Sequence, residues 1–211
     1  AADATASANN GTINGATATT GFIAGGGNFV RSGGQNISRA NTTTTTYPLT
    51  ISAWFNAADV TSSGVVAGLS KSGSGDGRKL LYVNAGTLRL YAQDGASAYA
   101  FPGATVAYTA NTWFYGVAVF NSQTDFKIYQ NGGNVGSSAT SVAFGAPNNT
   151  YIGRDNDPNN YFNGKVDEVR FSNVARSADW IRTEYNNQSS PATFTVVGVE
   201  KVQVNLSPVA N

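Results

Sequence analysis

YFNGKVDEVRFSNVARSADWIRTEY, residues 161–185, is the stretch that decides how this chain folds. Its first half predicts a β-strand. Assigning successive residues to opposite faces gives two faces that each mix apolar and polar side chains. Its second half predicts a short helix. Ser177 is a good N-cap, and Asp179 lies in the first turn, where the helix dipole favours a negative charge. We therefore expect a strand, a short turn and one helix here.

The rest of the chain favours β-structure. Asn131-Gly132 separates two apolar runs and accepts the positive φ angles of a tight hairpin turn, and residues 84–86 indicate a second hairpin. The chain contains 24 glycines and only 6 prolines in 211 residues, which is typical of short strands joined by tight turns. This length suits one sandwich domain. The composition therefore predicts an all-β, antiparallel β-sandwich.

Several motifs support a more specific expectation. Besides the closing stretch they are NGTINGA at 10–16, LTISAWF at 49–55, NTWFYGVAVF at 111–120, DFKIYQNG at 125–132 and YIG at 151–153. In this order they resemble the laminin-G-like, concanavalin A-like jelly-roll domains. The resemblance implies a jelly roll over residues 1–190 with one short C-terminal helix. The chain departs from the family at Phe114 and Tyr115, which replace the usual histidines, and at Trp180, where an acidic residue is common.

The segment 191–211 lies beyond the closing helix of that family. Its repeated valines predict one or two strands, so we expect a C-terminal β extension, an edge strand or a linker. An exposed edge strand invites pairing with another chain. Such an extension could close the sheet of this domain, lead to a following domain or dock a neighbouring subunit.

Missing residue types exclude several kinds of chemistry. The chain has no Cys and no His, which excludes thiol nucleophiles, a Ser-His-Asp triad and metal sites built from these ligands. Only 12% of residues are charged and the net charge is +1, so we expect no nucleic-acid partner. No apolar run approaches the ~20 residues that span a bilayer, so we expect no membrane insertion.

A pair of carboxylates is the remaining catalytic option. Asp167 and Glu168 are the only adjacent acids, and strict alternation points them to opposite faces of a strand, where they cannot act on one bond. We therefore predict no enzymatic activity and no catalytic residue. The pair fits two interpretations. It could bind a structural calcium ion; the favoured interpretation is that Glu168 pairs with Arg170 while Asp167 caps a neighbouring loop.

The polar segment 153–162, GRDNDPNNYF, separates two expected strands. Asp155, Asn156 and Asp157 offer several oxygens within a few residues, and Ca²⁺ takes ~6 to 8 oxygen ligands. The alternative is an ordinary loop of Asx-turns, in which these side chains bond their own backbone. The predicted metal ligands are thus Asp155, Asn156 and Asp157, with Asp167 at the separate acidic pair.

Aromatic side chains beside polar ones suggest carbohydrate binding, because sugars stack on exposed rings and hydrogen-bond to amides and carboxylates. The candidate ligand-binding residues are Tyr161, Asn159 and Asn160 on one loop and Tyr99 and Asp94 near another. Of these, Tyr99 and Tyr161 are the aromatics expected to be exposed. Other aromatics are expected to pack inside the sandwich, namely Trp54, Phe55, Trp113, Phe120 and Phe171, and Trp180 is expected to pin the helix.

The sequence thus predicts a non-catalytic recognition or adhesion module that binds a glycan or a surface protein. Its expected location is extracellular, on a cell surface or on a virion. The alternative is a structural assembly protein, such as a phage capsid decoration or tail-fibre domain. In that case the sandwich and the β tail would make contacts within a homo-oligomer or between virion subunits.

Overall fold

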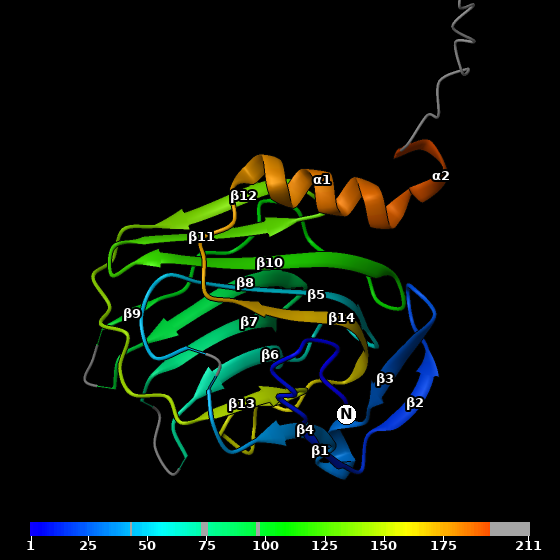
Figure 1. Ribbon diagram of the computed structural model, residues 1–211, viewed down its shortest axis with the longest axis horizontal. Helices are drawn as coiled ribbons and strands as arrows, with labels where there is room; N and C mark the ends of the chain where they lie inside the picture. Colours follow the sequence, from blue (N-terminus) through cyan, green and yellow to red (C-terminus); the bar gives the residue numbers. More distant parts are fainter. Residues whose placement is uncertain (43, 73–75, 96–97, 195–211) are drawn as a thin grey trace, which may run out of the picture.

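The computed structural model describes residues 1–42, 44–72, 76–95 and 98–194 (Figure 1). Within these ranges, two seven-stranded sheets form a sandwich, and neighbouring strands in each sheet pair antiparallel. In spatial order, sheet A consists of β1 (Thr12–Asn14), β4 (Asn36–Arg39), β13 (Asn149–Ile152), β6 (Gly64–Ser70), β7 (Arg78–Asn84), β8 (Thr87–Gln93) and β9 (Tyr99–Ala100). Sheet B consists of β12 (Gly133–Ser138), β11 (Asp125–Gln130), β10 (Trp113–Ser122), β5 (Leu49–Ala57), β14 (Gly164–Ser172), β3 (Gly25–Phe29) and β2 (Thr17–Thr20). The predicted all-β jelly roll is confirmed.

The described residues also contain three short helical segments, which are a 3₁₀ turn at Arg31–Gly33, α1 (Ala178–Ser189) and α2 (Pro191–Phe194). The segment expected to form a β extension thus begins with the short helix α2. The rest of that prediction, residues 195–211, lies outside the described residues. No helix in the described ranges is long and apolar enough to cross a membrane.

Strand β5 shows why sheet B is apolar on both faces. Leu49, Ile51 and Phe55 point into the core between the sheets and are fully buried. Trp54 points the other way, into a second apolar cluster with Tyr115. Alternating side chains of β5 therefore pack into two apolar clusters, one on each face of sheet B. Helix α1 covers the cluster on the outer face (Figure 1).

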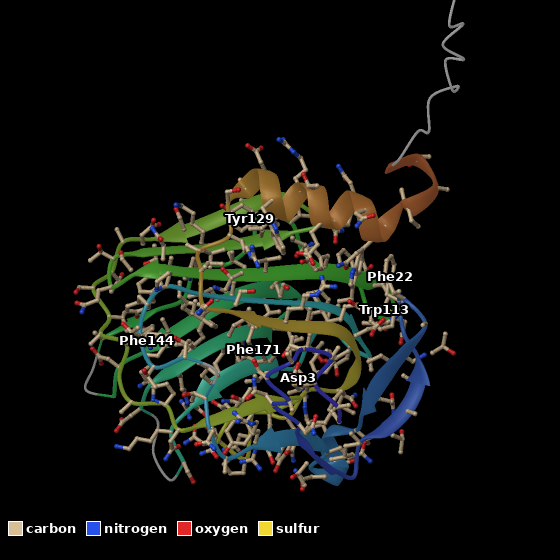
Figure 2. All side chains as sticks on the ribbon, in the orientation of Figure 1. Asp3, Phe22, Trp113, Tyr129, Phe144 and Phe171 are labelled. Atoms are coloured by element: carbon tan, nitrogen blue, oxygen red, sulfur yellow. The ribbon has the colours of Figure 1, made fainter. Side chains whose placement is uncertain are left out.

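Helix α1 is held on sheet B as the sequence predicted. The Ser177 hydroxyl accepts a hydrogen bond from the Trp180 backbone N–H at 3.2 Å, and Ile181 is buried against the second cluster. Trp180 packs at the margin of that cluster, where the Arg176 guanidinium lies 4.2 Å from its ring centroid. Figure 2 shows Tyr129 of β11 beneath this helix. Burial of one helical face, rather than helix propensity alone, therefore stabilises α1.

The predicted aromatic packing is largely confirmed. Phe55 and Phe120 are fully buried between the sheets, and Phe171 packs partly buried against the same core. Trp113 belongs to the margin of the second cluster, where the Phe22 ring meets it edge-on at 6.2 Å between centroids (Figure 2).

Strand β14 departs from strict alternation. Its register against β5 shifts between Asp167 and Arg170, and Glu168 has a φ of 49° in the left-handed region. This β-bulge inserts one residue, so that Val166 and Val169 both pack against the inter-sheet core. The prediction that Asp167 and Glu168 point to opposite faces is therefore wrong. Asp167 opposes the outward-facing Trp54, and Glu168 pairs with Arg170, which contacts Glu184 of α1 on the same side of the sheet.

Both hairpin predictions are confirmed. Asn131 and Gly132 have φ angles of 51° and 74° between β11 and β12, and Ala85 and Gly86 have 46° and 74° between β7 and β8. Paired positive φ angles match the right-handed twist of the flanking strands. The second turn fixes the register of β7 against β8, which matters for the site described below.

One cationic side chain lies inside the inter-sheet core. Lys79 of β7 is fully buried, and its Nζ donates to the backbone oxygens of Phe144, Gln93 and Ala143 at 2.8, 3.3 and 3.4 Å. Burial lowers the pKa of this ammonium from 10.5 to about 7, and the negative charge of Asp94 opposes that effect. The side chain joins the end of β8 to the segment before β13.

Candidate functional site

The outer face of sheet A carries the side chains that β7 and β8 direct away from the core. On β7 these are Arg78, Leu80 and Tyr82, because Lys79 and its alternate neighbours point inward. Leu80 pairs in register with Tyr91 of β8, so the two lie side by side on the same face. Leu80 and Tyr82 form a small apolar cluster separate from the main core.

Aromatic rings extend this cluster to the edge of the sheet. The Tyr91 ring centroid lies 6.2 Å from that of Tyr82, 5.3 Å from that of Phe101 and 6.4 Å from that of Tyr99. The planes of Tyr91 and Tyr99 are inclined by only 15°. Tyr99 is 58% exposed, as the sequence predicted. We call Tyr82, Tyr91, Tyr99 and Phe101 the aromatic platform.

The loop 153–163 between β13 and β14 forms a wall beside the platform. The Asn160 backbone oxygen accepts from the Val65 N–H at 3.0 Å, and the Asn156 N–H donates to the Ser70 Oγ at 3.2 Å. A Cβ at Gly64 would lie only 2.8 Å from the Cα of Phe162, so the loop backbone touches β6 directly. The loop is therefore fixed over the outer face of sheet A.

Arg78 links this wall to the sheet. Its Nε lies 2.9 Å from Asp155 Oδ2, and its terminal nitrogen lies 3.5 Å from Asp157 Oδ2. Asp155 is fully buried, and its Oδ1 also accepts from the Asp157 N–H at 2.9 Å and from the Asn160 amide at 3.4 Å. Burial raises the pKa of the Asp155 carboxyl, while the Arg78 charge lowers it. The carboxylate thus positions both Arg78 and Asn160.

A cavity of about 140 Å³ lies between the wall and the platform. Its lining residues are Arg78, Leu80, Tyr82, Tyr91 and Asn160. An apolar floor with a few polar groups at one side is the usual composition of a ligand pocket. This is the candidate functional site.

The predicted ligand-binding residues fall into two groups. Asn160 lines the cavity, Tyr99 ends the platform, and Asn159 is exposed on the wall, where its N–H donates to Asp157. Asp94 follows β8 and is not among the lining residues; its charge acts on Lys79. Asp94 is thus associated with the buried ammonium rather than with the cavity.

Tyr161 is half-buried rather than exposed, which corrects the sequence-based expectation. Its hydroxyl accepts from Arg154 at 2.9 Å, and the Arg154 guanidinium lies 5.1 Å from its ring and 5.3 Å from that of Tyr151. The backbone oxygen of Tyr161 accepts from Arg31. These contacts hold the ring within the protein surface.

The predicted metal ligands lie at two separate places. Asp155, Asn156 and Asp157 belong to the wall, where the Asp157 and Asn159 N–H groups donate to the carboxylates two residues before them, as in Asx-turns. Asp167 lies in sheet B. Among the described residues, no group of three or more acidic side chains is arranged to hold a metal ion. Calcium binding stays a prediction.

The favoured interpretation of the acidic pair is confirmed. Asp167 accepts from the Ile23 N–H in the β2–β3 turn at 2.8 Å, so it caps a neighbouring loop. Glu168 pairs with Arg170 at 2.6 Å, and Arg170 also contacts Glu184 of α1. Both carboxylates are thus engaged in fixing elements on sheet B.

Sequence reasoning placed Phe101 near Tyr99 and missed Arg78, Leu80, Tyr82 and Tyr91. The hairpin at residues 84–86 contained part of the signal, because a two-residue turn pairs Asn84 with Thr87 and thereby sets Leu80 opposite Tyr91. The approach of the loop 153–163 to β7 depends on the sheet order and has no local signal.

The chain matches a known family of proteins. A family model described as the concanavalin A-like lectin/glucanases superfamily matches residues 31–182. A search of curated proteins gives no match.

Solved structures share the fold at low identity. A heptameric pentraxin from Limulus polyphemus is 16% identical, with a TM-score of 0.60, over 71% of this chain and 75% of that one. Domain 4 of an extracellular arabinanase from Geobacillus stearothermophilus, solved with arabinotriose, is 15% identical, with a TM-score of 0.65, over 82% and 86%. The binding domain of Paraclostridial mosquitocidal protein 1 is 12% identical, with a TM-score of 0.71, over 90% of this chain and 50% of that one. The chain thus spans about half of that toxin domain.

Proposed function

The chain belongs to the concanavalin A-like lectin/glucanases superfamily, and on this basis we propose that it is a carbohydrate-binding module. Its binding site is the cavity on sheet A together with the aromatic platform. One observation carries this proposal. Tyr91 lines the cavity together with Arg78 and Asn160, and its ring stacks with that of Tyr99.

The chemistry of this site suits a sugar. A sugar ring presents C–H groups on its faces, which pack against aromatic rings, and hydroxyls at its edge, which need polar partners. The platform supplies the rings, while Arg78 and Asn160 supply hydrogen-bond donors and acceptors at the wall. One short row of side chains can therefore satisfy both surfaces of a saccharide.

The proposed module binds without cleaving. In support of this, Asp155 and Asp157 form ion pairs with Arg78, which lines the cavity. These pairs engage the carboxylates that general acid–base catalysis would need. The similar solved structures are also mostly binding domains, including toxin receptor-binding domains. We further propose that the protein works outside the cell, where glycans are displayed.

A glycan array tests this function. We expect binding to a subset of glycans and its loss in Tyr91→Ala and Tyr99→Ala. A matched control is Val174→Ala, because Val174 is exposed and lies just beyond β14 of sheet B, away from the platform. The proposal is wrong if no glycan binds at high protein concentration, or if the platform variants bind like the control.

Assembly into a homo-oligomer is a second candidate function, and edge strand β2 favours it. Its residues Thr17–Thr20 are mostly exposed and carry no charge or proline, the usual features that prevent pairing with another strand. Light scattering over a range of concentrations tests this. A dimer that Ala18→Lys dissociates would support assembly, and a monomer at high concentration would refute it.

A further inference from the structure

The cavity on sheet A is closed at one end. The wall formed by the loop 153–163 is bonded to β6 through Asn160 and Asn156, and its backbone touches Gly64. A chain lying flat on the sheet therefore meets the wall at Asn160 and cannot continue along the sheet toward β6.

The cavity is also small. Its volume of about 140 Å³ is below the ~300 to 1,000 Å³ typical of pockets for drug-sized ligands. A space of this size holds one sugar ring rather than a segment of several.

The other end of the site follows the sheet to its edge. From Tyr91 the platform passes to Tyr99 on β9, which is the last strand of sheet A. Tyr99 is 58% exposed, so a ring resting on it lies at the margin of the molecule. Further sugars can extend from the cavity in this direction.

The charge of the cavity is balanced. Among the described residues that line it, Arg78 is the one that carries a charge, and its guanidinium contacts the carboxylates of Asp155 and Asp157. Two carboxylates beside one arginine leave no excess of positive charge to attract an acidic sugar. This favours a neutral ring.

Resting on the proposed function, we propose that the site recognises the end of a neutral saccharide chain. One terminal ring occupies the cavity against Asn160 and Tyr82, and the rings that follow lie over Tyr91 and Tyr99. Recognition of chain ends rather than chain interiors is the consequence of the closed wall.

Competition experiments test this mode of binding. The probes are arabinan, xylan, a β-glucan and a mannan, each added intact or after partial hydrolysis, at equal sugar mass, against the immobilised parent polymer. If ends are recognised, about tenfold more chain ends lower the midpoint of competition about tenfold, because occupancy follows the concentration of the recognised group. A midpoint that is unchanged or raised by hydrolysis overturns the proposal. Polygalacturonan is an acidic chain. If it competes more strongly than the neutral polymers, the proposal that the site prefers a neutral sugar is wrong.

Two variants assign the parts of the site. We expect Tyr99→Ala to weaken binding of a trisaccharide about tenfold, the scale of one lost aromatic contact, and to leave binding of the single sugar unchanged. Asn160→Ala should weaken both. Tyr99 is exposed, so its loss should leave the melting temperature unchanged. Equal effects of both variants on the single sugar and the trisaccharide would contradict the assignment. Absence of binding by every probe would instead refute carbohydrate binding itself.

Discussion

Replacing Lys79 with methionine removes a buried ammonium from the core between the sheets. The wild-type side chain is fully buried among three backbone oxygens, and the Phe144 ring centroid lies 5.1 Å from Nζ. Burial lowers the pKa of Lys79 to about 7 from 10.5 in the exposed state. Burial also raises the pKa of the adjacent Tyr47, so its phenol stays neutral over the same range.

The sign of the effect follows from proton binding. Between pH 7 and 10.5 the unfolded chain keeps a proton on Lys79 that the folded protein has lost, so the free energy of unfolding rises with pH. Below pH 7 both states are protonated and this contribution is constant. The pKa difference between 10.5 and about 7 corresponds to at most about 5 kcal/mol at 1.36 kcal/mol per unit.

Lys79→Met abolishes this pH dependence. Loss of the donor to three carbonyl oxygens costs about 1 kcal/mol for each bond. At pH 6 this loss is offset by removal of a buried charge, whereas at pH 10 it is not. We therefore expect the variant to lose stability relative to the wild type as pH rises, by up to a few kcal/mol between pH 7 and 10.

Urea unfolding at pH 6 to 10 measures this difference. Lys127→Met is the control, because Lys127 is 40% exposed beside Asp125, and its stability should follow the wild type at each pH. The other titrating groups are common to all three proteins. A difference between wild type and Lys79→Met that stays constant with pH would refute the reasoning.

Three further predictions concern stability. Ser177→Ala should lower the free energy of unfolding by ~0.5 to 2 kcal/mol, because the Trp180 N–H loses its cap, and urea unfolding would show no loss if the cap were dispensable. Ala85→Gly should raise the free energy of unfolding by about 0.5 kcal/mol, because residue 85 has a φ of 46°. The control is Ala58→Gly, since Ala58 is exposed and has no positive φ, and this change should not stabilise the protein. Equal effects of the two substitutions would contradict the turn argument. If the wall binds calcium, millimolar Ca²⁺ should raise the melting temperature of chelator-treated protein, and Asp157→Asn should abolish this rise. An unchanged melting temperature would mean that the carboxylates of the wall pair with Arg78 and do not bind calcium.

Local sequence patterns were sufficient for most of the elements, though not for α2, and were insufficient for the site. The cap at Ser177 and the turn at Asn131-Gly132 are set by neighbouring residues, so their prediction succeeded. The meeting of Arg78 with Asp155 joins residues far apart in the chain through the order of strands in sheet A, which no local pattern contains. The predicted exposure failed at Tyr161 because the Arg154 side chain packs on its ring and bonds its hydroxyl, and the spacing of these two residues does not by itself indicate that contact.

The bulge in β14 marks a second limit. Alternation assigned the faces of the strand from its start, and the extra residue at Glu168 reversed the assignment for everything after it. The spacing of three between Val166 and Val169 was the available signal, since apolar residues of one face are otherwise separated by two. Sequence patterns thus predict strands more securely than they predict which side a given residue faces.

The covering of sheet B by α1 has a practical consequence for protein engineering. Because the outer face of that sheet is filled by Trp54, Tyr115 and the helix, random substitution there would destabilise the domain. The outer positions of β8 and β9 in sheet A, such as Arg89, Tyr91 and Tyr99, are only partly buried or exposed. A combinatorial library confined to these positions could therefore yield new specificities on one scaffold, because the residues being varied are not those that hold it together.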